Sequence, residues 1–214
     1  MPKSFRCLAW ICFAVAGLVA GPVSAASPKD LIEKLNATFI DVMKNAATLG
    51  YDGRHAALEP VLNDAYDFPE MTRVSSGRYW RDLTDEQKQQ LIETFKEYSL
   101  ATYAARFDGF SGERFEVLGE DAAPADNVRV NNQIVQSNGQ PIRIDYLLRP
   151  DGAGWRIVDV YLKSSVSELA VRRSEFTSVL AKEGFDGLIA MLETKIAALK
   201  KGAPADGDDT STEN

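Results

Sequence analysis

The chain has 214 residues and a net charge of −7, from 24 lysine and arginine residues against 31 aspartate and glutamate residues. With 45% hydrophobic residues, it has the composition of a globular protein and not of a disordered or collagen-like one. An acidic chain is poorly suited to general nucleic-acid binding, because duplex affinity depends on basic groups that neutralise phosphates. We therefore expect a folded protein without a nucleic-acid partner.

Residues 1–25 have the pattern of a secretory signal peptide. Lys3 and Arg6 precede an apolar run over residues 7–20, and small residues occupy the cleavage positions 23–25. An uncleaved membrane anchor is the alternative, but the run is shorter than the ~20 residues that a spanning helix needs. The sequence therefore predicts a cleaved leader and export of the mature chain.

Both cysteines, Cys7 and Cys12, lie within this leader. The mature chain would then contain no thiol, which excludes disulfides, thiolate nucleophiles and cysteine metal sites. At the other end, residues 202–214 form an acidic, low-complexity segment that we expect to be disordered. The sequence thus predicts a leader over 1–25, one folded domain over 26–201, and a tail over 202–214.

The folded part opens with helical periodicity. Ser27 at the N-cap and Pro28 after it start the first helix, and Thr84-Asp85-Glu86-Gln87 is a capping box for the fourth. Glycines end the first, third and fourth helices. The patterns predict helices over residues 28–49, 58–65, 68–76 and 85–108.

After Gly112 the hydrophobic period changes from helical to two, and it returns to helical after the last strand. Ser165-Val166-Ser167-Glu168 caps a helix that Gly184 separates from a final amphipathic helix. Helices, then an antiparallel meander, then helices predict an α+β fold, with the helices packed on one concave face of a twisted sheet. The alternating runs predict four strands, over residues 115–117, 128–134, 142–149 and 155–162.

Candidate catalytic groups are few. The single histidine, His55, lies in a turn-like stretch, and we interpret it as a solvated loop residue and not as a general base. One histidine and no mature cysteine exclude the usual metal-ligand sets, and no nucleophile elbow or phosphate-binding glycine loop is present. An acid/base pair of Tyr146 with Asp159 is the remaining enzymatic alternative, because cone-shaped α+β folds can host isomerases that use tyrosine and aspartate.

Apolar and aromatic side chains, in contrast, are abundant. Several amphipathic helices face strands that carry residues such as Phe115, Ile144 and Tyr146. Such a layout can close into a solid core or enclose an apolar cavity, and spacing alone does not decide between them.

Several stretches carry a recognisable combination of motifs. Residues 79–87, followed by Phe95 and Tyr103, match a W-x-x-L-x-x-x-Q … F … L … Y pattern, and residues 146–160 match Y-x-L … W-x-V-x-D-V. Residues 165–176 match G-V-S … R-x-x-F, with serine where glycine is usual. In this combination the chain resembles the MlaC-type, toluene-tolerance family of periplasmic lipid-binding proteins. Residues 67–71, 103–113 and 167–176 resemble its hopanoid-biosynthesis-associated HpnM branch.

The resemblance implies an NTF2/cystatin-like α+β fold whose helices and sheet enclose an apolar pocket for lipid tails. It implies a monomeric carrier, without catalysis or cofactor, that moves phospholipid or hopanoid across the periplasm between inner- and outer-membrane complexes. The alternatives are a solid-cored interaction module of a transport assembly and an isomerase-like enzyme. We expect the pocket to be lined by Phe68, Met71, Phe95, Tyr98, Ile144, Tyr146, Leu148, Val160 and Val166.

Overall fold

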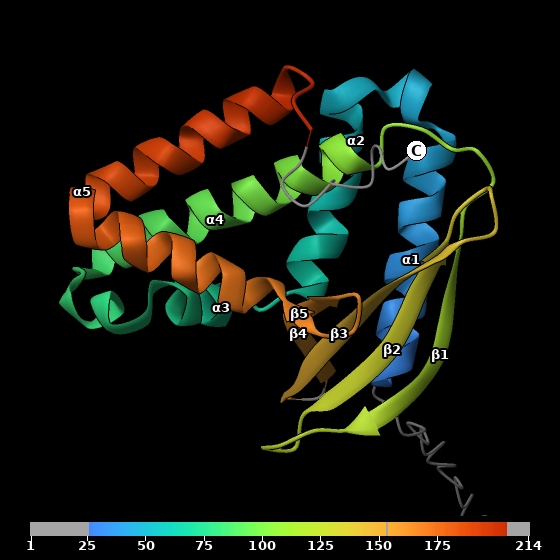
Figure 1. Ribbon diagram of the computed structural model, residues 1–214, viewed down its shortest axis with the longest axis horizontal. Helices are drawn as coiled ribbons and strands as arrows, with labels where there is room; N and C mark the ends of the chain where they lie inside the picture. The colour runs from blue at the N-terminus through green and yellow to red at the C-terminus, as the bar shows by residue number, and fades with distance from the viewer. Residues whose placement is uncertain (1–25, 153, 205–214) are drawn as a thin grey trace, which may run out of the picture.

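The computed structural model describes residues 26–152 and 154–204 (Figure 1). The sheet is preceded by helices α1 (Pro28–Lys44), α2 (Ala46–Ala65), α3 (Phe68–Ser76), the 3-10 helix η1 (Gly77–Asp82) and α4 (Asp85–Arg106). The rest of the fold consists of β1 (Arg114–Ala122), β2 (Val128–Val135), β3 (Pro141–Asp151), β4 (Gly154–Leu162), β5 (Val166–Ser167) and α5 (Glu168–Lys200). This order confirms the predicted α+β class.

The predicted leader lies outside the described residues, as do residues 205–214 of the predicted tail. Among the residues that are described, no helix is both long enough and apolar enough to cross a membrane.

The strands form one five-stranded sheet in the order β1-β2-β3-β4-β5, and each strand is antiparallel to its neighbours. The predicted strands are all present, and β5 is an addition that the alternation did not indicate. The register places Tyr146 of β3 opposite Val160 of β4, and Ile144 opposite Leu162. Because paired residues share a face, these four side chains lie together on one side of the sheet.

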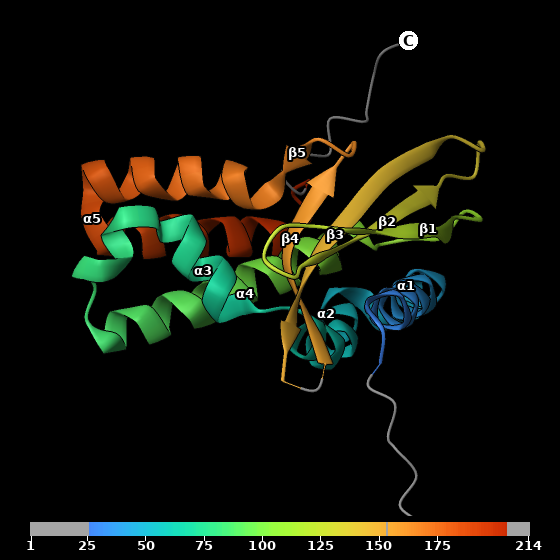
Figure 2. The ribbon, with the colours of Figure 1, turned by 90° about the horizontal axis from the view of Figure 1, so that it is seen from below.

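The helices cover one face of the sheet and extend past its edge. Figure 2 shows α1 and α2 beneath the sheet, whereas α3, α4 and α5 form an arm beyond β4 and β5. The segment between α2 and α3 joins the two parts, because the Asp67 N–H donates to the carbonyl of Ile157 in β4 at 2.9 Å. The start of the arm is thereby fixed to the sheet.

Three predicted helix starts, at Ser27, Asp67 and Thr84, are confirmed by their caps. The Ser27 hydroxyl accepts the Asp30 N–H, and the Thr84 hydroxyl accepts the Gln87 N–H, each within a reciprocal capping box. The Asp67 carboxylate accepts the Glu70 N–H at the start of α3. Such caps satisfy backbone donors that have no partner inside the helix.

Three predicted boundaries are wrong. The first helix ends at Lys44 and not before Gly50, because the Asn45 side chain bonds the Asp41 carbonyl and competes with the helical backbone. The second helix begins at Ala46 and not at Leu58, and Gly50 forms a kink within it. The fourth helix ends at Arg106, with Phe107 as its C-cap, and not at Gly109.

The last helical segment differs from prediction only at its cap. Ser167, and not Ser165, caps α5, since its hydroxyl accepts the Ala170 N–H. The predicted break is confirmed at Gly184, whose φ of 72° lies in the region that favours glycine. At this break α5 reverses its direction, and its two halves lie alongside α4 (Figure 1).

A buried carboxylate joins the middle strands. Asp145 of β3, 1% exposed, accepts hydrogen bonds from Arg129 at 3.0 Å, from Arg143 at 3.0 Å and from the Asn132 N–H at 3.1 Å. Burial raises the pKa of the Asp145 carboxyl, but the bonds from Asn132 and Arg143 outweigh burial and lower the pKa below its usual value. The ionised form is therefore the one that the fold stabilises.

We expect Asp145→Asn to lower the free energy of unfolding by about 2–3 kcal/mol at pH 7, because both arginines lose a charged acceptor. A carboxyl with a lowered folded pKa stabilises the protein above its unfolded pKa and loses that effect as pH falls through the folded pKa. The difference from wild type should therefore shrink below about pH 4. Urea unfolding of both proteins at pH 7 and pH 3 tests this, and equal stabilities at pH 7 would contradict it.

Candidate functional site

A cavity of about 130 Å³ lies between the sheet and the helices, and the empty space reaches about 860 Å³ when the open solvent at its mouth is included. Its walls come from α4 and the first turns of α5, from strands β1, β3 and β4, and from the α2–α3 region. The choice between a solid core and a cavity, which spacing left open, is thereby decided in favour of a cavity.

Simple periodicities bring the lining residues together. Phe95, Tyr98 and Thr102 recur on α4 at spacings of three and four, so they share one face of the helix. Ile144 and Tyr146 are two residues apart on β3 and therefore point to the same side of the sheet. The cavity is the space between these two faces.

Most residues expected in the pocket are at the cavity, but not all of them. Phe68 and Leu148 are buried in the core and do not line it, and Val166 is 44% exposed on the short strand β5. The Phe68 ring stacks on Tyr66 at 5.6 Å between centroids, so it supports the wall from behind. The cavity is lined by the predicted residues Met71, Phe95, Tyr98, Ile144, Tyr146 and Val160.

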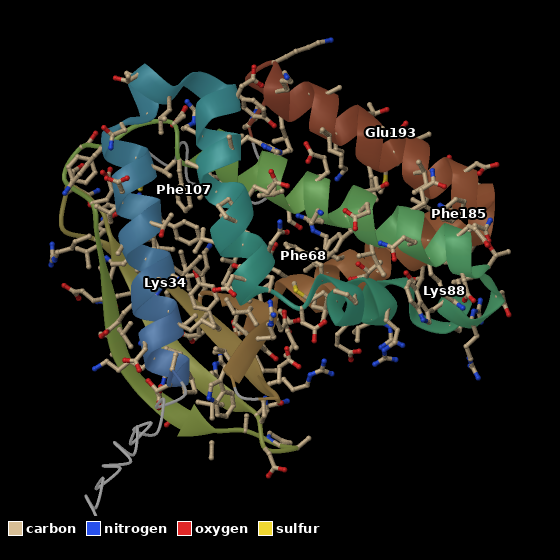
Figure 3. All side chains as sticks on the ribbon, turned by 180° about the vertical axis from the view of Figure 1, so that it is seen from behind. Lys34, Phe68, Lys88, Phe107, Phe185 and Glu193 are labelled. Atoms are coloured by element: carbon tan, nitrogen blue, oxygen red, sulfur yellow. The ribbon has the colours of Figure 1, made fainter. Side chains whose placement is uncertain are left out.

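Sequence reasoning missed an aromatic wall and the polar residues. Phe39 of α1 packs against Tyr103 at 5.2 Å and against Phe107 at 4.6 Å between ring centroids. Figure 3 labels Phe68 and Phe107, which lie where the helices meet the sheet. The α4 residues among those missed continue the helical spacing from Phe95 and Tyr98, and that signal could have found them. The lining residues not predicted are Tyr66, Ser99, Thr102, Tyr103, Arg106, Phe107, Phe115, Leu162, Glu168, Leu169 and Arg172.

Tyrosine hydroxyls and an arginine give the cavity a polar component. The hydroxyls of Tyr66 and Tyr103 are 2.5 Å apart, and burial raises the pKa of both. Burial also raises the pKa of Tyr146 well above its usual value. Arg172 lies over the Tyr98 ring at 4.8 Å. The tyrosines are therefore neutral hydrogen-bonding groups at physiological pH and not bases.

The candidate catalytic residues do not form a catalytic site. Asp159 accepts the backbone N–H groups of Val160 and Leu169 and the hydroxyl of Ser167, so it holds the start of α5. Tyr146 lines the cavity and Asp159 does not, so the proposed acid/base pair is not assembled. Across residues 26–152 and 154–204, no group of three or more His, Cys, Asp or Glu side chains could hold a metal ion.

His55 is a helical residue, and the expectation of a solvated loop histidine is wrong. It lies within α2, and its Nε2 is 3.0 Å from Oε1 of Glu97 on α4. The backbone is non-helical at Gly50 (φ 59°), and the helix then runs through Gly53, where packing on α4 compensates for the weak helix propensity of glycine. His55 links two helices and does not line the cavity.

We expect His55→Ala to leave ligand binding unchanged, because the imidazole is separate from the cavity. Loss of the partly exposed contact with Glu97 should cost at most about 1 kcal/mol of unfolding free energy. Binding assays and thermal unfolding of the variant test both statements. A folded variant that no longer binds its ligand would reopen the enzymatic interpretation.

The fold and the cavity together define an α+β protein built around an apolar chamber. The model of the MlaC protein family matches residues 33–194. The chain therefore belongs to the MlaC family.

Two known proteins extend the comparison. The chain is 24% identical over 181 residues to the intermembrane phospholipid transport system binding protein MlaC of Haemophilus influenzae, covering 80% of this chain and 83% of that protein. It shares its fold, with a TM-score of 0.70 and 24% identity, with the phospholipid-binding protein of Ralstonia solanacearum, solved in complex with a phospholipid. That likeness covers 82% of this chain and 98% of the other.

Proposed function

We propose that this protein is a periplasmic carrier that encloses lipid tails in its cavity and moves them between inner- and outer-membrane complexes. The observation that carries the proposal is the cavity between α4, α5 and the sheet, whose walls are mainly aliphatic and aromatic. Membership of the MlaC family supports it, since the Haemophilus influenzae relative is the binding protein of an intermembrane phospholipid transport system.

The cargo that we propose is a phospholipid, or a hopanoid in the branch that the sequence motifs resemble. The solved relative from Ralstonia solanacearum binds a phospholipid, which supports the first. Only the motif resemblance supports a hopanoid. Both lipids present apolar carbon skeletons that an apolar cavity can remove from water.

We infer further that the protein is monomeric and carries its cargo without changing it. Among the residues described, the candidate pair Tyr146 and Asp159 is not assembled and His55 lies apart from the cavity. No observation favours the isomerase alternative, and the cavity argues against an interaction module with a solid core.

The test is to purify the exported protein without detergent, extract it with organic solvent, and analyse the extract by mass spectrometry. We expect a lipid in stoichiometric amount, and its mass distinguishes phospholipid from hopanoid. Protein that is folded and free of lipid would support the interaction module instead. A bound lipid that is converted during incubation would support an enzyme.

A further inference from the structure

The cavity carries positive charge although the whole chain is acidic. Its charged lining residues are Arg106, Arg172 and Glu168, so the formal charge of the lining is positive on a chain of net charge −7. Positive charge in an apolar chamber is costly unless a counter-charge is near. The question is which of the two arginines can serve a ligand.

Arg172 is engaged within the protein. Its guanidinium is 3.3 Å from Glu175 and 3.9 Å from Glu168, and it lies over the Tyr98 ring. Glu175 is also bonded to Lys195 at 2.7 Å. This cluster balances its own charges and fixes the first turns of α5 against α4.

Arg106 lies at the border between the cavity and an outer hollow. The outer hollow has about 1280 Å³ of empty space, open solvent included, and shares Arg106, Phe107, Ile144 and Leu162 with the cavity. Its charged lining residues are Arg106, Lys163, Asp108 and Glu113, whose formal charges sum to zero. Arg106 is therefore placed where the apolar chamber meets the solvent.

Polar hydroxyls lie on the chamber side of Arg106. Tyr66, Tyr103 and Tyr146 all line the cavity, and the Arg106 charge acts to lower the pKa of each against the effect of burial. Tyr103 precedes Arg106 by three residues on α4, so the two side chains share one face of the helix. Because the Arg106 guanidinium has five N–H donors, it can keep contacts within the protein and still donate to a ligand.

We propose that Arg106, together with the Tyr103 hydroxyl, binds the acidic headgroup of the cargo at this border. The group is a phosphate or a carboxylate attached to apolar chains, so the cavity selects acidic lipids over uncharged ones. This inference rests on the proposed function of lipid carriage. A charge-assisted hydrogen bond is about twice as strong as a neutral one, and arginine can form two in parallel with either group.

The test is equilibrium competition binding to delipidated protein with pairs of lipids that differ only in the acidic group. The pairs are phosphatidic acid against diacylglycerol with the same chains, and oleate against oleyl alcohol. We expect at least about tenfold preference for the acidic member of a pair. Preference confined to the first pair identifies a phosphate, and preference confined to the second identifies a carboxylate.

We expect Arg106→Gln to abolish the preference while diacylglycerol and oleyl alcohol bind as before, and Arg106→Lys to restore part of it. Tyr103→Phe should reduce the preference severalfold. Arg81→Gln is the matched control, because Arg81 is exposed in η1 and lines neither the cavity nor the outer hollow. It should keep the full preference.

A preference that survives Arg106→Gln, or a wild-type protein that binds both members of each pair equally, would overturn this inference. Wild-type protein that binds none of the four lipids would instead contradict lipid carriage itself. The two failures are therefore distinguishable. If Arg106→Gln does not fold, Arg106→Lys and Tyr103→Phe give the answer alone, since unchanged preference in both would contradict the assignment.

Discussion

Ile144→Asp should empty the cavity of lipid while the protein remains folded. Ile144 lines both the cavity and the outer hollow, so a carboxylate there lies at the border between the two. A charge placed against an enclosed lipid tail costs several kcal/mol. If the new carboxylate pairs with Arg106, which lines the same border, it occupies the place proposed for the headgroup, so lipid is lost in either case. The Ile144 side chain is only partly buried, so the fold itself should tolerate the change.

The measurement is the lipid content of the variant after purification without detergent, next to circular dichroism as a check of folding. Ile144→Ala should retain lipid, because it removes apolar surface without adding charge. Leu118→Asp is the matched control, since Leu118 is 49% exposed on β1 and does not line the cavity. A folded Ile144→Asp protein with the wild-type amount of lipid would show that the cargo lies elsewhere.

Loaded protein should transfer little lipid to plain anionic liposomes. Burying one methylene stabilises a chain by roughly 0.8 kcal/mol, so a fully enclosed 16-carbon tail gains on the order of 12 kcal/mol relative to water. Spontaneous release into solution is then very slow. Removal of the proposed leader would take away two of the 24 basic residues, Lys3 and Arg6, and would change the net charge from −7 to −9. An anionic surface repels such a protein.

Transfer should rise sharply when the liposomes contain the cognate membrane complex, because a protein partner can open the cavity against an apolar path. A fluorescent phospholipid whose emission changes on entering the bilayer gives the rate. Empty liposomes and liposomes with an unrelated membrane protein are the controls. Fast and complete transfer to protein-free liposomes would mean that the cavity is shallow or open, in conflict with its enclosure by α4, α5 and the sheet.

The fold was largely predictable because its signals are local. Capping boxes at Ser27 and Thr84, the break at Gly184 and the change from helical to two-residue period each depend on neighbouring residues alone. The errors arose where the backbone had a competing partner. The Asn45 side chain bonds the Asp41 carbonyl and ends α1 within an uninterrupted apolar stripe. The strand β5 exists only because β4 lies beside it.

The site was predictable in part, for a different reason. Periodicity shows that Tyr98 and Tyr146 face inward. It does not show whether these side chains line a cavity or pack against other side chains in a solid core. Leu148 and Val160 are both apolar residues of alternating strands, yet Val160 lines the cavity and Leu148 does not. The pairing of β3 with β4 shifts register between Leu147 and Leu148, and the sequence pattern does not show this shift. Arg106 is charged, so the hydrophobic pattern did not mark it as a lining residue. Its position between the cavity and the outer hollow depends on where α4 ends.

The most direct test of the account is to find where a lipid tail lies. The purified protein is loaded with a phospholipid whose acyl chain carries a photoactivatable diazirine, irradiated, digested and analysed by mass spectrometry. Crosslinks should fall on the α4 and β3 peptides that contain Phe95, Tyr98, Tyr103 and Tyr146, and Ile144→Asp should abolish them. Equal labelling of the exposed residues of α1 and α2, unaffected by that substitution, would contradict enclosure of the tail in the cavity.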